Sequence, residues 1–123
     1  MAGDMFTLAE ARVQLGTLRA HIDEFLARRA DLADLRADLA AGRPSRHGGL
    51  AEAKAWEARL YADLEGFADI GAQVKGFAPL LLDFPGRHDG MAVLWCWLEG
   101  DESIDWYHRA DSGFAGRRRV QHR

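Results

Sequence analysis

Apolar residues recur at helical spacing through the first third of the chain. From residue 7 to residue 41 they occupy the a and d positions of a heptad repeat, which is interrupted by Arg29 and Arg36. Thr7 and Glu10 match the capping-box pattern, in which each side chain accepts a hydrogen bond from the other's backbone amide, so they predict where the helix starts. The resulting prediction is one long helix with an apolar stripe of Leu8, Ala11, Leu15, Leu18, Ile22, Phe25, Leu32 and Leu39.

A second apolar pattern, with a spacing of three and four, runs from residue 50 to residue 69 and predicts a shorter helix. Residues 42–49 contain three glycines and a proline, which is typical of a turn between helices. We therefore expect an antiparallel coiled-coil hairpin over residues 6–70. Because the second helix is the shorter one, part of the stripe on the first helix lacks a partner. A second copy of the chain is the simplest partner that could bury the remaining apolar residues, so we expect a homodimer through the first helix.

After residue 71 the periodicity shortens from that of a helix to that of a strand. Residues 91–98 alternate Val93, Trp95 and Trp97 with Leu94, Cys96 and Leu98, which predicts a central strand with two apolar faces. Weaker strand patterns cover residues 73–76, 79–84 and 103–110, separated by turn-rich text at 85–90 and 99–102. The fold class expected is α+β, with the helical hairpin followed by a small antiparallel sheet of three or four strands.

The composition is that of a soluble globular protein. The chain has 123 residues, of which 48% are hydrophobic and 28% charged, and its formal net charge is −3. We expect a single domain over residues 1–123, with the hairpin at 6–70, the sheet and a loop at 71–117, and a basic tail at 118–123. No apolar run approaches the roughly 20 residues that span a bilayer, so we expect no membrane segment. The single cysteine excludes an intramolecular disulfide and fits a cytoplasmic location.

Several short motifs, spread over nearly the whole chain, together carry a family resemblance. They are Phe6-Thr7-Leu8-Ala9-Glu10-Ala11, Leu82-Asp83-Phe84-Pro85, Cys96-Trp97, Gly100, Glu102, Trp106, His108, Asp111 and Gly113-Phe114-Ala115-Gly116-Arg117. In this combination the chain resembles the bacterial family called domain of unknown function 2203. The resemblance implies an architecture and a set of polar positions, and it implies no activity.

Polar side chains in and around the predicted sheet form a candidate site. Its members are Asp83, Arg87, Glu99, Glu102, Trp106, His108, Asp111 and Arg117. A histidine with several carboxylates can bind Fe, Mn, Zn or Cu in a mixed nitrogen and oxygen site, and the candidate ligands are His108, Asp111, Asp83 and Glu102. Arg87 or Arg117 would then hold an anionic substrate. The alternative is that these groups cap turns and form ion pairs, with Asp83 paired to Arg87 and Asp111 paired to Arg117.

Three further features each have a structural and a functional interpretation. Cys96 is either a small buried apolar residue or a nucleophile with His108 as its base. The tryptophans near the end of the chain are either core residues or a stacking platform for nucleic acid. The last seven residues contain four arginines, which are either solvated or contact RNA, DNA or an acidic protein. His47, His88 and His122 are expected to be ordinary surface residues.

These patterns lead to one principal prediction of function and two alternatives. The principal prediction is a homodimeric interaction or scaffold module that is not an enzyme. The first alternative is a small metal-binding protein or metal-dependent enzyme with a histidine and carboxylate site on the sheet. The weaker alternative is nucleic-acid binding through the basic tail and the aromatic residues, and we expect nucleic acid to be an unlikely partner.

Overall fold

The computed structural model describes residues 5–121 and divides the chain into two compact units. One unit is Leu18–Gly66, and the other combines Met1–Thr17 with Phe67–Arg123. Helices α1 (Leu8–Ala40) and α2 (Leu50–Asp69) both run across the boundary between the units. None of the helices in the described residues combines the length and the apolar character needed to cross a membrane. The prediction of a single domain stays a prediction.

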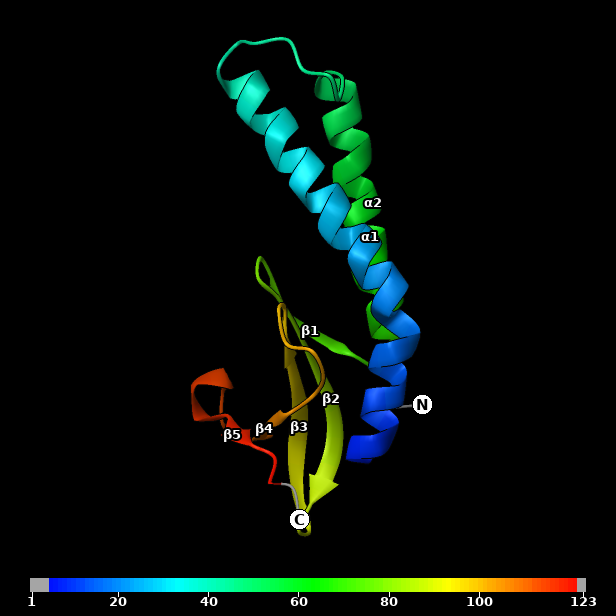
Figure 1. Ribbon diagram of the computed structural model, residues 1–123, viewed down its shortest axis with the longest axis vertical. Coiled ribbons are helices and arrows are strands. Elements are labelled where there is room, and N and C mark those ends of the chain that lie inside the picture. The colour runs from blue at the N-terminus through cyan, green and yellow to red at the C-terminus, as the bar shows by residue number, and fades with distance from the viewer. Residues whose placement is uncertain (1–4, 122–123) are drawn as a thin grey trace. The chain divides into compact units, whose positions relative to one another are not determined.

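The unit of residues 18–66 is an antiparallel helical hairpin (Figure 1). Two ion pairs connect its helices: Arg28 to Asp63 at 2.9 Å, and Arg36 to Glu57 at 2.6 Å. The partner of Arg36 comes earlier in α2 than the partner of Arg28, so the two helices run in opposite directions. The predicted hairpin is therefore confirmed.

The predicted capping box is present at the start of α1. The backbone amide of Thr7 donates to Oε1 of Glu10 at 2.8 Å, and the amide of Glu10 donates to Oγ1 of Thr7 at 3.1 Å. At the other end of α1, Gly42 has a φ of 68°, a left-handed conformation that favours glycine and ends a helix. Local sequence signals thus specify both ends of this helix.

Most of the apolar stripe of α1 is buried within the single chain. Ala11 and Leu15 are buried in the unit that contains the sheet, and the later stripe positions up to Leu32 are buried as well. Leu39, at the end of the stripe, is 38% exposed. The dimer was predicted because part of this stripe has no partner in the second helix. Since most of the stripe is already buried within one chain, that argument loses its main support. The dimer itself remains a prediction.

The second unit contains a five-stranded antiparallel sheet in the order β1-β2-β3-β4-β5 (Figure 1). A short 3₁₀ turn, η1 (Phe114–Gly116), lies between the last two strands. The α+β class is confirmed, whereas the sheet has one strand more than the three or four predicted. The strands are β1 (Gln73–Phe77), β2 (Leu80–His88), β3 (Met91–Leu98), β4 (Trp106–Arg109) and β5 (Arg118–Arg119).

The additional strand is formed by residues that we expected to be a solvated tail. Arg118 pairs with Tyr107 and Arg119 with Trp106, so β5 covers the free edge of β4. The next residue, Val120, is buried and its amide donates to the carbonyl of Asp105 at 2.8 Å. A run of two arginines shows no alternation of apolar and polar residues, so the sequence could not predict this strand. It is recognised only by its pairing with β4.

Strand β2 is longer than the sequence predicted, because it continues through Pro85 and Gly86. β1 pairs with β2 only as far as Asp83, which leaves the following residues on a free edge where a proline without an amide hydrogen is tolerated. Phe6 occupies that edge: its amide donates to the carbonyl of Pro85 at 2.7 Å, and it forms a parallel bridge with Gly86. The segment before α1 is thereby attached to the sheet.

The register gives the sheet two chemically different faces. Trp95 lies on one face, where its indole Nε1 donates to the carbonyl of Phe6 at 2.8 Å. The other face carries Asp83, directly opposite Cys96, and we call it the polar face. The residues of the polar face discussed below are Asp83, Cys96, Trp106 and His108.

Candidate functional site

The polar face is centred on a buried pair formed by Asp83 and His108. Nε2 of His108 lies 3.1 Å from Oδ2 of Asp83, and the two side chains are only 4% and 1% exposed. Nδ1 of His108 lies 3.0 Å from the carbonyl oxygen of Arg109 and 2.9 Å from that of Ser112. Carbonyl oxygens only accept hydrogen bonds, so Nδ1 carries a proton. The hydrogen bond between Nε2 of His108 and Oδ2 of Asp83 requires one further proton. If His108 holds that proton, an imidazolium cation faces a carboxylate anion, and if Asp83 holds it, both side chains are uncharged. The net charge of the pair is zero in either case.

Cys96 lies beside this pair, opposite Asp83 on the neighbouring strand. Burial raises the pKa of the Cys96 thiol to about 12, and the charge of Asp83 acts in the same direction, whereas a hydrogen bond with Arg117 opposes it. The reactive form of a cysteine is the thiolate, which a pKa this high makes rare at neutral pH. The geometry therefore favours the interpretation of Cys96 as a buried apolar residue over that of a nucleophile.

Arg117 attaches the C-terminal turn to the polar face. Its guanidinium carbon lies 4.4 Å from the ring centroid of Trp106 and 4.6 Å from that of Phe114, so the cation contacts two aromatic rings. Nη1 of Arg117 also lies 3.7 Å from Oδ2 of Asp101. Arg117 thus helps to hold the glycine-punctuated loop that precedes β5 in place.

The structure does not assemble the metal site predicted on the sheet. Of the four candidate ligands, Asp83 and His108 bond to each other, whereas Asp111 and Glu102 are exposed. Among the described residues, no three of these four groups bring their ligand atoms within 4.8 Å of one another. The separation has a simple cause: Asp111 and Glu102 lie in loops outside the ladder that joins β2, β3 and β4.

The two predicted ion pairs are also replaced by others. Asp83 bonds to His108 and not to Arg87, which is exposed on β2. Asp111 pairs with Arg109 at 2.9 Å. The errors have one origin, because proximity in the sequence suggested both pairs and the strand register decided the actual partners.

Glu99 has a structural role at the end of the sheet. Its Oε1 accepts a hydrogen bond from the amide of Leu80 at 2.9 Å, and its own amide donates to the carbonyl of Leu80 at 2.9 Å. These two bonds join the end of β3 to the start of β2. The interpretation of Glu99 as a residue that caps a turn therefore has direct support.

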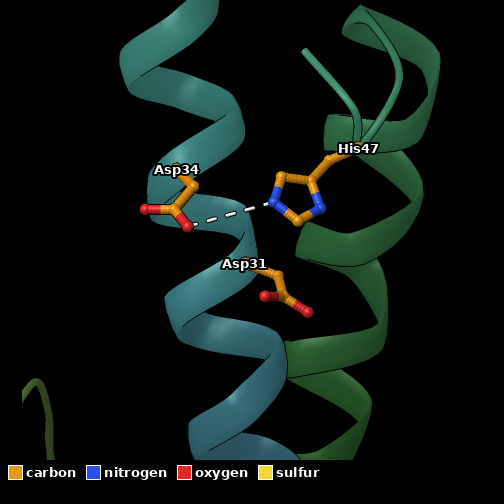
Figure 2. Close-up of side chains that lie close together, drawn as sticks. All are labelled: Asp31, Asp34 and His47. Carbon is orange, nitrogen blue, oxygen red and sulfur yellow. Dashed lines mark ion pairs between the residues drawn. The ribbon is translucent and has the colours of Figure 1, made fainter.

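A cluster that the sequence analysis missed lies in the helical hairpin. Asp31 and Asp34 are separated by three positions in α1 and therefore lie on one side of the helix, and His47 comes from the link before α2 (Figure 2). One ligand atom from each side chain lies within 4.8 Å of the other two, and Nε2 of His47 is 3.9 Å from Oδ2 of Asp34. The two aspartates three apart were the only local signal. The position of His47 depends on how the link folds back.

The imidazole of His47 is held in position by a neighbouring aromatic ring. It contacts Trp56 of α2 edge to face, with ring centroids 5.5 Å apart, and its side chain is only 11% exposed. Nε of Arg46 lies 3.5 Å from Nε2 of His47. His47 is therefore not the ordinary surface residue that the sequence predicted. His122 lies outside the described residues.

Comparison with known families supports the resemblance found in the sequence. Residues 4–120 match a family model described as Uncharacterized conserved protein (DUF2203). The chain belongs to the DUF2203 family. That description assigns no activity to the DUF2203 proteins. No curated protein and no solved structure matches the chain.

The structure shows where this member of the DUF2203 family places the motifs of the resemblance. Asp83 comes from β2, Cys96 from β3, and Trp106 and His108 from β4. Arg117, at the end of the last motif, contacts Trp106. Four separate stretches of sequence therefore meet at the polar face.

Proposed function

We propose that the protein is a small metal-binding protein whose cation is held by Asp31, Asp34 and His47. The observation that carries this proposal is the convergence of one imidazole and two carboxylates, from a helix and a link, within 4.8 Å (Figure 2). The alternative predicted from the sequence was a metal site on the sheet, and the site proposed here lies in the hairpin instead. Three protein ligands leave room in the coordination sphere for water or a further ligand.

The donor set favours a transition-metal ion over calcium or magnesium. Zinc, iron, copper and nickel readily bind imidazole nitrogen, whereas calcium and magnesium prefer ligand sets made of oxygen atoms. Manganese also accepts carboxylate oxygens. Ligand bonds of about 2.0–2.1 Å place tetrahedral ligand atoms roughly 3.3 Å apart. The 4.8 Å limit within which the three atoms lie is wider than this, and rotation of the aspartate side chains can bring them closer.

The local charges also support a cation at this position. Within the described residues, the carboxylate of Asp31 has no hydrogen bond or ion pair, although the residue is only partly exposed. In the same part of the chain, Asp34 has only the 3.9 Å contact with His47. Arg46 is a competing cation, and its 3.5 Å contact with Nε2 of His47 is at the outer limit for a hydrogen bond. A metal ion would replace Arg46 at that nitrogen.

The test is zinc binding by tag-free protein. We expect Zn²⁺ titrated into chelator-treated protein to bind at one site per chain by isothermal calorimetry. Asp34→Asn and His47→Gln should each weaken binding by about tenfold or more, because each removes one direct ligand. Asp23→Asn is the matched control, since Asp23 is an exposed aspartate of the same helix. Equal zinc affinity in the wild type and in both ligand variants would refute the proposal.

The homodimeric interaction or scaffold module remains a second proposal, and it rests on the heptad pattern. The large apolar residues that α1 exposes are Val13 at 68% and Leu39 at 38%, which support a further contact less strongly than a continuous stripe would. Light scattering coupled to size exclusion at micromolar concentration tests it, and a monomer would remove this proposal while leaving the metal site untouched. The free thiol of Cys96 supports a reducing compartment such as the cytoplasm.

A further inference from the structure

A polar groove lies at the edge of the sheet, in the unit that does not contain the cation cluster. It has a volume of about 410 Å³. Its walls come from three places in the chain. These are the end of β2 and the turn after it, strand β4, and strand β5 together with Gln121. The described residues that line it are His88, Asp89, Tyr107, Arg118, Arg119 and Gln121.

Two arginines of β5 border the groove. Arg118 and Arg119 are exposed, and neither forms an ion pair within the part of the chain that the structure describes. Their backbones are fixed, because both residues pair with β4. Successive residues of a strand point to opposite faces, so Arg118 shares the face of Tyr107, whereas the guanidinium carbon of Arg119 lies 5.7 Å from the ring centroid of Trp106 on the polar face. A guanidinium group binds phosphate through paired N–H donors, so Arg118, on a held strand, is a suitable anion-binding group.

Aromatic rings form the wall next to the arginines. The rings of His88 and Tyr107 have centroids 4.9 Å apart, and both contact the buried indole of Trp95, at 5.6 and 5.9 Å. Tyr107 is directly opposite Arg118 in the register of β4 and β5. A partly exposed ring beside a guanidinium group matches a ligand in which a planar ring and a phosphate are a short distance apart.

We propose that this groove binds a mononucleotide, with Arg118 on the phosphate and with Tyr107 and His88 against the base. The volume is within the range of roughly 300–1,000 Å³ that is usual for small-ligand sites. A long nucleic acid fits less well. It needs a continuous positive track, whereas this chain has a net charge of −3 and the groove also contains Asp89.

The proposal is tested by calorimetric titration of the full chain with AMP and CMP in the presence of EDTA, so that a metal in the hairpin has no part in the result. We expect both nucleotides to bind and adenosine to bind about 10- to 100-fold more weakly, because it lacks the phosphate. Arg118→Gln should lower AMP affinity to a similar extent. Arg87→Gln, on the other face of the sheet, is the matched control and should bind AMP like the wild type.

Tyr107→Leu separates the ring contact from the charge, since it keeps both arginines and should still weaken AMP binding. Circular dichroism spectra confirm that each variant is folded before titration. Four results would overturn the proposal: no AMP binding by the wild type, equal affinity for AMP and adenosine, equal affinity for AMP and inorganic phosphate, or tighter binding of an oligonucleotide than of AMP. The zinc titration of the hairpin gives an independent answer, because none of its variants touches the groove.

Discussion

Removal of the carboxylate of Asp83 should destabilise the sheet. In the native structure Oδ2 of Asp83 satisfies Nε2 of His108 in a nearly dry environment, where the two side chains are 1% and 4% exposed. Asp83→Ala leaves that nitrogen buried without its partner. Asp83→Asn is different, because its amide can donate to Nε2 of a neutral His108 whose Nδ1 keeps its proton and its carbonyl partners.

The contacts set the size of these two effects. Loss of one partner from a buried ion pair costs about 3–5 kcal/mol. His108 keeps its Nδ1 contacts, and within the described residues Oδ1 of Asp83 has no hydrogen-bond partner to lose, so the lower end of that range applies. We expect Asp83→Ala to lower the free energy of unfolding by about 3 kcal/mol. Asp83→Asn, which keeps one neutral hydrogen bond, should cost about 1 kcal/mol.

The assay is urea-induced unfolding followed by tryptophan fluorescence. Trp95, Trp97 and Trp106 all lie in the unit that contains the sheet, so the signal mainly reports this unit. Asp111→Ala is the matched control, because Asp111 is exposed and its ion pair is with the exposed Arg109, and it should change stability by less than about 0.5 kcal/mol. A loss below about 1 kcal/mol for Asp83→Ala, or equal losses for the alanine and asparagine variants, would refute this account of the pair.

Three other predictions concern stability. The pKa of Cys96, raised to about 12 by burial, means that the unfolded thiol loses its proton from about pH 9.0 while the folded thiol keeps it. Relative to Cys96→Ala, the wild-type free energy of unfolding should therefore fall above that pH by up to about 1.4 kcal/mol per unit, whereas parallel pH profiles would contradict the assignment. Gly86→Ala should cost about 2 kcal/mol or more in urea unfolding, since its Cβ would meet the carbonyl oxygen of Phe6 and the indole of Trp95, and an unchanged stability would show that the segment can shift. Thr7→Ala removes half of the capping box and should cost about 1 kcal/mol by thermal melting, and no loss would mean that the box is not stabilising.

Features encoded by neighbouring residues could be predicted before the fold was known. The capping box at Thr7 and Glu10, the second helix at Leu50–Asp69 and the central strand at Met91–Leu98 are all at the predicted positions. Each depends on interactions or periodicity within a few residues, which the amino-acid order contains directly. Their order along the chain was enough to predict the α+β class and the helical hairpin.

Which polar groups meet could not be predicted in the same way. Asp83 and His108 were both candidates, but their contact joins residues that lie 25 positions apart and depends on the register of three strands. A shift of one residue in that register would turn either side chain to the opposite face. His47 likewise reaches Asp34 only because the link folds back along α1.

The sequence by itself determined the local elements, their order and the family to which the chain belongs. Only the tertiary structure decided that Arg118 and Arg119 form an edge strand beside Tyr107, that the candidate ligands on the sheet separate, and that a histidine and two aspartates converge in the hairpin. The physical reason is the separation along the chain between the residues that interact. Helix caps and alternation are set by neighbours in the chain, whereas a binding site is set by strand pairing and loop return, whose free energy is shared among residues far apart in the sequence.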